Sequence, residues 1–285
     1  GMELELTHRN KIGEVGYNLK GIATVTRQKY LTASEKGPWA NSYDRWRNDN
    51  LTNRYQGVQF GYTSAGRYTS WNDIWNYYGF KERDVLPGDY KYEDWNGDGE
   101  INGQDEHPFA FDQTPWLQFS LNAGLQWKNF DFNMLLQGSA LGSMEYKEPL
   151  HEIWGKNGGG ALTQFLDRWH PVDPKADPYD PSTVWTSGHY AYTGRWAKNN
   201  SAFNRVSTAY LRLKSIELGY TFPKLKQIPN ASLRVYANAY NLLTFTGVKF
   251  VDPEHPDDDL GRMYPLNKTY TLGVSLSCLL YTSDA

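Results

Sequence analysis

Side chains that carry oxygen recur at short intervals in residues 94–105, DWNGDGEINGQD. Counted from the first aspartate, carboxylate or amide oxygens stand at positions 1, 3, 5, 9 and 12, and a glycine stands at position 6, where a calcium loop turns sharply. This spacing of hard oxygen ligands predicts a Ca²⁺ site. The expected ligands are Asp94, Asn96, Asp98, Glu100 through its backbone carbonyl, Asn102 and Asp105.

The last position of this loop departs from the EF-hand pattern, because Asp105 stands where that pattern has a bidentate glutamate. No amphipathic helix flanks the loop. We therefore expect the ion to act as a structural clamp, not as a switch that opens a pair of helices. The alternative is a turn rich in aspartate, asparagine and glycine that binds no metal.

Most of the 11 tryptophans fall in irregular parts of the sequence. Aromatic rings there can stack on sugars or peptides, although they also serve as ordinary packing anchors. An acidic run over residues 252–259 has two interpretations, a second cation site or a solvated loop. The tryptophans assigned to substrate contact are Trp71, Trp75, Trp154 and Trp185.

Enzymatic motifs are absent from the sequence. It has no G-x-S-x-G, P-loop, H-E-x-x-H or Rossmann pattern, and its six histidines lack zinc-ligand spacing. No pair of carboxylates stands out as catalytic. The sequence therefore predicts a protein that is not an enzyme.

The elements that would position these residues are long strands, seen most clearly in residues 115–141. Apolar and polar residues alternate there on both sides of Lys128 and Asn129, with Leu135 as the exception, which predicts a hairpin of two strands of about 12 residues each. Strands of soluble proteins usually have about 5–6 residues, whereas a tilted strand that crosses a bilayer needs about 9–11. The hairpin is long enough to cross a membrane.

Similar alternation predicts further strands over residues 2–8, 15–25, 206–222, 233–240 and 266–277. The apolar parity changes near Lys214, which predicts a β-bulge. Shorter elements expected between them are strands within residues 57–65 and 89–92 and a helix within residues 162–169. On the seven long strands, one face should carry Leu121, Leu125, Phe132, Leu136, Val235 and Leu272, and the other Asn122, Gln126, Asn133, Asn238 and Ser275.

The predicted connections alternate between short and long. Short turns are expected at residues 9–13, 128–129 and 223–230, and longer loops at residues 28–114, 142–204 and 246–265. Outer-membrane barrels have short periplasmic turns and long external loops, so this order is typical of the last part of such a barrel. The competing interpretation is a secreted, soluble, calcium-dependent glycan-binding β-sandwich, but sandwich strands recur every 8–12 residues or so.

Composition restricts the classes of protein to which the chain could belong. The net charge of -3 over 285 residues argues against nucleic acid as a partner, and a mean hydropathy of -0.70 with no long apolar run excludes a transmembrane helix in the sequence. The first residues show no secretory signal, so we expect either a cytoplasmic protein or a missing beginning. The last eight residues, CLLYTSDA, resemble a translated sequencing adapter, so we expect residues 278–285 to be an artefactual tail.

Several stretches, in order along residues 1–277, together resemble the C-terminal part of a SusC/RagA-type TonB-linked outer-membrane transporter. Besides the hairpin, the matching stretches are PGDYKYEDWNGDG at 87–99, DRWHP at 167–171, YLRLKSIELGY at 210–220, NLLTF at 241–245 and YPLNKTYTLG at 264–273. The resemblance implies an all-β fold, the C-terminal portion of a transmembrane antiparallel barrel of about 22 strands, with seven long strands in this chain.

The same resemblance implies partners and a location. Transporters of this type are energised by TonB, contain an N-terminal plug, lie in the outer-membrane lipid of Gram-negative bacteria and pair with a SusD-like surface lipoprotein. They import oligosaccharides or peptides too large for porins. The chain shows no TonB box, plug or first part of the barrel, so alone it is not expected to transport. The family ends in an aromatic residue where Cys278 stands.

Overall fold

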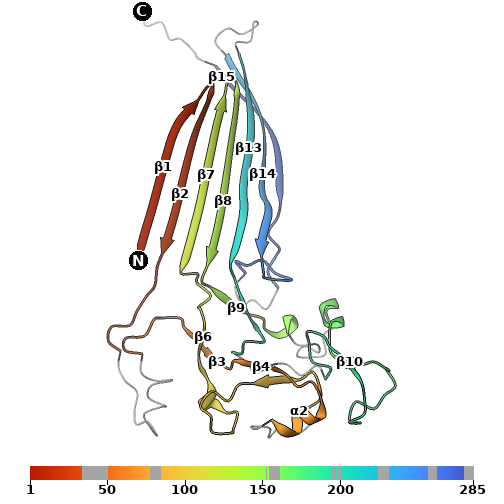
Figure 1. Ribbon diagram of the computed structural model, residues 1–285. Helices are drawn as coiled ribbons and strands as arrows, with labels where there is room; N and C mark the ends of the chain where they lie inside the picture. The colour runs from red at the N-terminus through yellow and green to blue at the C-terminus, as the bar shows by residue number, and fades with distance from the viewer. Residues whose placement is uncertain are drawn as a thin grey trace, which may run out of the picture.

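A tall sheet and a cluster of loops at one end of it make up the molecule (Figure 1). The computed structural model describes residues 1–33, 51–77, 85–151, 153, 161–193, 197, 200–223, 231–255 and 262–278. The predicted turn at residues 223–230 and the tail from residue 279 lie almost wholly outside these ranges.

Seven antiparallel strands form the sheet, and neighbours in the chain are neighbours in the sheet. The outermost strands, β1 and β15, do not pair with each other. The all-β fold with seven long strands is therefore confirmed. In order, the strands are β1 (Met2–Ile12), β2 (Val15–Val25), β7 (Leu117–Trp127), β8 (Phe130–Ala140), β13 (Tyr210–Phe222), β14 (Ala231–Thr246) and β15 (Thr269–Cys278).

Several strand bounds differ from the sequence prediction. β1 continues to Ile12, because Gly13 adopts a φ of +59° and closes a much tighter turn than expected. β14 runs on to Thr246. The strand expected over residues 206–222 is two strands, since the Ser207 hydroxyl accepts a hydrogen bond from the Ala209 N–H (3.3 Å) and interrupts the ladder there.

The predicted β-bulge is confirmed on β13. The pairing of β13 with both neighbours shifts register between Leu213 and Ser215. On the β14 side, two residues stand opposite Lys214, and one of them, Asn241, has a φ of +53°. Asparagine tolerates this left-handed conformation better than most residues, which accommodates the bulge.

The two faces of the sheet differ as predicted. The register places Leu125, Phe132, Leu218, Ala237 and Leu272 in one row across five strands. This apolar face is open, with Leu218 54% and Leu272 85% exposed. The neighbouring row on the opposite, polar face joins Gly124, Asn133, Glu217, Asn238 and Thr271.

Most of the hydrophobic core lies in the loops, and few buried apolar side chains belong to the sheet. The most deeply buried apolar side chains include Ile74, Leu86, Met144 and Phe165, all in the two long connections. No helix in the described ranges is both long enough and apolar enough to span a membrane.

Small elements build the loop cluster. Its four two-stranded sheets and its helical turns hold both long connections together at the lower end of Figure 1. They are β3 (Gln59–Gly61) with β6 (His107–Ala110), β4 (Ser64–Arg67) with β5 (Tyr90–Tyr92), β9 (Ser143–Glu145) with β12 (Arg205–Ser207), β10 (His170–Pro171) with β11 (Trp185–Thr186), α2 (Trp71–Asn76), and the 3₁₀ turns η2 (Gly103–Asp105), η3 (Glu148–Leu150) and η4 (Thr163–Leu166). The helix expected within residues 162–169 is thus only the turn η4.

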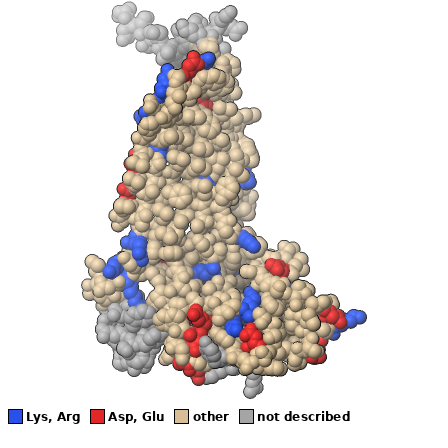
Figure 2. Space-filling view, viewed as in Figure 1, with Lys and Arg blue, Asp and Glu red and all other residues tan. Residues whose placement is uncertain are grey.

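A soluble β-sandwich is not supported. Across the described ranges, every sheet other than the seven-stranded one has two strands, so none covers the long sheet. Figure 2 shows charged side chains sparse over the middle of the long sheet and more frequent around the loops. An uncovered apolar sheet face is unusual for a protein in water.

Candidate functional site

The predicted calcium loop folds around its first aspartate. The carboxylate of Asp94 accepts hydrogen bonds from the backbone N–H groups of Gly97 (2.8 Å), Asp98 (3.2 Å) and Gly99 (2.8 Å). Gly97 and Gly99 have φ values of +75° and +83°, which glycine adopts without steric cost. The local sequence therefore fixes a tight loop in which the first carboxylate lies inside the turn.

The last aspartate closes the same loop. Asp105 is fully buried, and its carboxylate accepts hydrogen bonds from the N–H groups of Trp95 (3.0 Å), Asn96 (3.4 Å) and Asn102 (2.7 Å). Asn102 in turn accepts from the N–H of Gln104 (2.7 Å). The beginning and end of the loop are thus tied together by side-chain oxygens.

The middle of the loop presents oxygens that partly serve its own backbone. The Asn96 side-chain oxygen accepts from the Asp98 N–H (2.9 Å), and Asp98 accepts from the Glu100 N–H (2.8 Å) and from the Asn96 amide (2.9 Å). Among the described residues, no group of three or more His, Cys, Asp or Glu side chains is close enough to hold a metal. The backbone fold and the type of ligand fit Ca²⁺, and binding stays a prediction.

Two of the four predicted substrate-contacting tryptophans meet in one pocket. Trp71 and Trp185 line a cavity of about 350 Å³ in the loop cluster. Trp75 lies next to Trp71, with ring centroids 5.9 Å apart, and its side chain is 63% exposed. Trp154 lies outside the described residues. The full lining is Thr69, Ser70, Trp71, Pro87, Trp169, Pro181, Thr183, Val184, Trp185 and Ser187.

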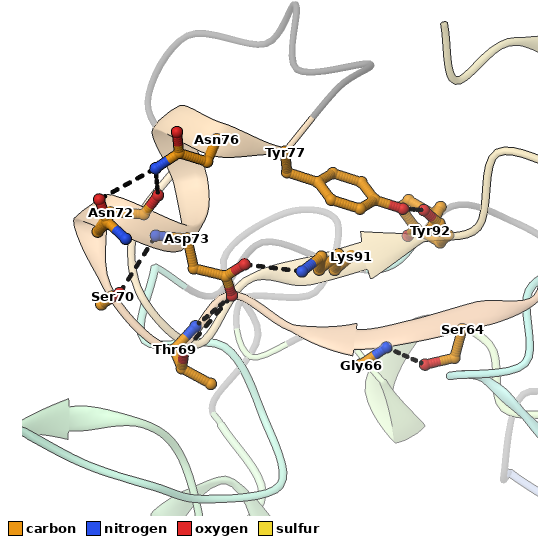
Figure 3. Close-up of polar contacts among 10 residues, drawn as sticks. All are labelled: Ser64, Gly66, Thr69, Ser70, Asn72, Asp73, Asn76, Tyr77, Lys91 and Tyr92. Atoms are coloured by element: carbon orange, nitrogen blue, oxygen red, sulfur yellow. Dashed lines mark hydrogen bonds and ion pairs between the residues drawn. The ribbon is translucent and has the colours of Figure 1, made fainter. Parts of the chain in front are cut away.

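One wall of this cavity is the start of helix α2. Ser70 caps the helix by accepting the Asp73 N–H (3.2 Å), as a serine in that place commonly does (Figure 3). Asp73 then accepts the Thr69 N–H (3.1 Å) and pairs with the ammonium of Lys91 on β5 (2.7 Å). The helix is thereby held against the β4 and β5 hairpin.

The ion pair with Lys91 helps to lower the pKa of the Asp73 carboxyl. Burial alone raises the pKa of the Asp73 carboxyl, but the hydrogen bonds from Lys91 and Thr69 outweigh burial and leave the pKa below its usual value. Asp73 is therefore ionised at neutral pH and keeps Lys91 paired.

The second wall comes from the other long connection. Arg67 donates to the carbonyl of Gly88 (2.7 Å) and also to the carbonyl of His189, which belongs to the other loop. Gly88 has a φ of +94°, and a Cβ there would lie 2.3 Å from the ring of Trp169. Only glycine lets the two loops approach this closely, so they pack as one unit.

The acidic loop after β14 is anchored to the sheet. The guanidinium of Arg212, 1% exposed, pairs with Asp252 (2.5 Å) and Glu254 (2.5 Å) and donates to the Thr244 hydroxyl (3.0 Å). Asp252 and Glu254 thus pair with Arg212 while staying partly exposed, and the other acids of the run, at 257–259, lie outside the described residues. In the sequence, this contact could have been predicted from an arginine on the polar face of one strand and an acidic loop that follows the next strand.

This anchored loop and the polar face enclose a cavity of about 520 Å³. Leu135, the exception to the alternation in its strand, also faces this cavity. A further charge cluster lies on the same face, where Arg234 contacts Asp131 (3.0 Å) and Glu217 (2.7 Å). Polar residues that line the cavity include Gln113, Gln118, Gln137, Ser139, Glu254 and His255.

Known structures share this architecture. The RagAB peptide transporter superposes with a TM-score of 0.58 over 95% of this chain at 17% identity, and the RagAB peptide importer in its open-open state with 0.54 over 96% at 18%. The chain covers 28% of the RagAB chain in each case. At this level of identity, the likeness concerns the fold.

Curated relatives are similar to this chain in sequence as well. TonB-dependent receptor P3 of Formosa agariphila is 28% identical over 209 residues, which cover 68% of this chain, and TonB-dependent receptor SusC of Bacteroides thetaiotaomicron is 26% identical over 208 residues, which cover 72%. The chain is related to the SusC/RagA-type TonB-dependent receptors. The resemblance read from the sequence is thereby confirmed. No protein-family profile matches the chain.

This chain is much shorter than the SusC/RagA-type receptors that it matches. It spans 19% of P3, 22% of a second Formosa agariphila relative, TonB-dependent receptor P26, and 19% of SusC. The chain thus spans about a fifth of the length of these relatives.

Proposed function

We propose that residues 1–277 are the C-terminal portion of the barrel of a TonB-dependent outer-membrane transporter. The observation that carries this proposal is the single sheet of seven strands, apolar and open on one face and polar on the other, with the long connections gathered at one end. A bilayer would cover the apolar face with lipid, while the polar face would line the lumen. The loop cluster would then lie outside the cell.

We infer the substrate class of the whole receptor from the resemblance and from the solved structures. We infer import of oligosaccharides or peptides by the whole receptor, since the solved RagAB structures are a peptide transporter and importer. The relatives are named as receptors and transporters, which supports transport and not catalysis. A SusD-like lipoprotein at the loop end and TonB, reached through another part of the receptor, are the proposed partners.

Uptake by cells that carry the whole receptor tests this function. Labelled oligosaccharides and short peptides are offered to cells with and without an uncoupler of the proton gradient. We expect the receptor in the outer-membrane fraction, and uptake of one substrate class that stops when the gradient or TonB is removed. A receptor found in the soluble fraction, or uptake that ignores TonB, would contradict the proposal.

We also propose that the loop of residues 94–105 binds one structural Ca²⁺. The ligands would be the side chains of Asp94, Asn96, Asp98 and Asp105, the carbonyl of Glu100 and, directly or through water, Asn102. A hard cation would balance the negative charges of Asp94, Asp98 and Asp105. In this proposal, the ion stiffens the loop that leads from β5 to β6.

Equilibrium dialysis of the whole receptor with Ca²⁺ tests the loop. Asp98→Ala removes one ligand and should lower the bound calcium by about one ion per receptor, with weaker protection of the loop from proteases. Asp180→Ala is the matched control, because Asp180 forms a comparable turn with the Ser182 N–H (2.8 Å) in the other connection. Equal calcium content in the wild type and Asp98→Ala would remove the proposal.

A further inference from the structure

Two basic side chains lie just beyond the end of β2, where the long sheet meets the loop cluster (Figure 1). Arg27 and Lys29 follow Val25, the last residue of β2, and both are exposed. Val25 itself pairs with Leu117 at this end of the apolar face. Figure 2 shows Lys and Arg side chains at the border between sheet and loops, below the middle of the sheet, where charges are sparse.

Aromatic rings restrain the side chain of Arg27. Its guanidinium carbon lies 3.2 Å from the centroid of the Tyr55 ring and 3.9 Å from that of Trp116. The two ring centroids are 6.1 Å apart, so the guanidinium lies between the rings. Cation–π attraction from both rings holds the group in place although it is exposed to solvent. The position of this positive charge is therefore well defined.

Lys29 brings a second positive charge to the same ring. It pairs with Tyr55 in an antiparallel bridge, and its ammonium nitrogen lies 5.8 Å from the centroid of the Tyr55 ring. Among the described residues, neither Arg27 nor Lys29 forms an ion pair or a side-chain hydrogen bond. Two neighbouring cations without a counter-charge repel each other, so a bound anion would be favourable here.

The two donors suit a phosphate group. A guanidinium can donate two parallel hydrogen bonds to phosphate oxygens, and an ammonium adds a compact charge with three donors. Arg27 and Lys29 together therefore match a phosphate better than a single carboxylate, which carries less charge and fewer oxygens.

The pair lies at the level expected for lipid headgroups. β2 has 11 residues, which at about 3.3 Å per residue and a tilt of about 40° cross roughly 28 Å. The hydrocarbon core of a bilayer is about 30 Å thick, and the headgroup layer outside it is about 5–8 Å thick on each side. Arg27 stands two residues beyond Val25, at most about 7 Å further along the chain, which places it in that layer.

We propose that Arg27 and Lys29 bind a phosphate group of a lipid in the outer leaflet, next to the apolar face of the sheet. Tyr55 and Trp116 suit the same level, because Tyr and Trp are enriched at membrane–water interfaces. An acidic protein segment would also balance the charges, but it would not explain why they lie beside a face that lipid chains cover. The inference rests on the proposed membrane location and adds a class of lipid as a ligand.

Binding of lipid A to the whole receptor in detergent tests this site. Native mass spectrometry measures the bound lipid, with dephosphorylated lipid A as the comparison and inorganic phosphate as a competitor. Arg27→Gln and Lys29→Gln remove one positive charge each. Lys175→Gln is the matched control, because it removes the same charge from an exposed residue between β10 and β11, outside this cluster.

We expect lipid A to bind, with affinity reduced about three- to tenfold by Arg27→Gln and by Lys29→Gln and unchanged by Lys175→Gln. Dephosphorylated lipid A should bind more weakly to the wild type and equally to all variants. Equal binding of the two lipids, or unchanged affinity in both cluster variants, would overturn the inference. Full displacement of lipid A by inorganic phosphate at equal concentration would indicate a site for free phosphate and overturn it too.

Assembly of the same variants separates this inference from the proposed function. The heat-dependent shift in gel mobility shows whether each variant is folded in the outer membrane. Cluster variants that assemble there and still bind lipid A like the wild type would remove the lipid site and leave the barrel proposal in place. A wild-type receptor absent from the outer membrane would remove both.

Discussion

Arg212 is the residue that connects the sheet to the acidic loop. Its side chain is almost fully buried on the polar face, and its charge is balanced by Asp252 and Glu254 from the loop. A buried guanidinium without these partners would be strongly unfavourable. These ion pairs therefore help to hold the loop over the polar face.

Neutralising one acid should loosen this loop. Asp252→Asn replaces an ionic hydrogen bond to Arg212 with a neutral one, and we expect the free energy of local opening to fall by about 1–3 kcal/mol. Limited proteolysis of the membrane-inserted receptor measures this change, because easier opening should give faster cleavage near residues 248–255. Asp180→Asn in an exposed turn should leave that cleavage rate as it is. Equal rates in Asp252→Asn and the wild type would show that Arg212 does not hold the loop.

The contrast between Asp94 and Arg212 shows which residues a sequence can identify. The oxygens of residues 94–105 belong to one local loop, so their spacing alone predicts the turn that forms. Arg212 and Asp252 are 40 residues apart, and their contact depends on how a loop folds back over a sheet. Nothing in local spacing carries that information, and the same holds for the meeting of Trp71 with Trp185.

Helix α2 has only six residues and depends on its contacts. A helix this short is not stable by itself, so the Ser70 cap and the Asp73–Lys91 pair hold it against β5. Trp71 is the first residue of this helix, so the position of the pocket wall depends on the same contacts.

The depressed pKa of Asp73 makes these contacts sensitive to acid. A carboxyl whose pKa is lowered on folding adds stability that is present above its unfolded pKa of about 3.9 and is lost as the pH falls through the folded value. We expect the protection of α2 amides from hydrogen exchange, corrected for the intrinsic pH dependence of exchange, to fall below about pH 4 in the wild type. Asp73→Asn should remove that acid response and cost roughly 1 kcal/mol or less at pH 7.

Lys91→Gln is the matched variant, since it removes the same pair from the other side. It should raise the folded pKa of Asp73 toward its unfolded value and so weaken the acid response. Protection factors of α2 amides that stay constant between pH 6 and pH 3 in the wild type would contradict this role of Asp73.

The bulge at Lys214 sets which side chains face each way on β13. Before it, Leu211 and Leu213 share the apolar face, and Arg212 lies on the polar face. Because side chains alternate with a period of two, removing one residue would reverse this order. The bulge is what allows Arg212 and Glu217 to lie on the same face.

Deleting Lys214 should therefore prevent assembly. The deletion would turn Arg212 away from Asp252 and Glu254 and leave these three charges without their ion pairs. Lys214→Ala keeps the bulge and should change stability by no more than about 0.5 kcal/mol. The folded fraction in the outer membrane, measured by the heat-dependent shift in gel mobility, separates the two. A deletion variant that assembles normally would exclude this role for the bulge.

Strand existence could be read from the sequence more reliably than strand ends. Alternation over β7, β8 and β15 predicted these strands, because one face of each is uniformly apolar. The apolar pattern predicted one strand over residues 206–222, with a change of parity near Lys214, yet the ladder breaks after Ser207, where the Ser207 hydroxyl accepts a hydrogen bond from the Ala209 N–H. Such local competition leaves no trace in the apolar pattern.

The whole molecule combines an uncovered sheet with a well-packed loop cluster. The apolar face offers side chains whose burial is worth about 1.5–3 kcal/mol each, and no other described part of the chain covers them. The two edges, β1 and β15, stay unpaired with each other. In a larger barrel within a bilayer, lipid would cover the apolar face and further strands would pair with both edges.

The environment of two adjacent side chains in the middle of β7 tests this arrangement most directly. Leu121 belongs to the apolar face and Asn122 to the polar one. In the whole receptor with Cys278→Ser, a spin label is placed at Leu121→Cys or Asn122→Cys, and its collisions with oxygen and with a water-soluble nickel complex are measured in lipid vesicles. We predict oxygen-dominated relaxation at position 121 and nickel-dominated relaxation at position 122. Equal exposure of both labels to the nickel complex would contradict a membrane-spanning sheet.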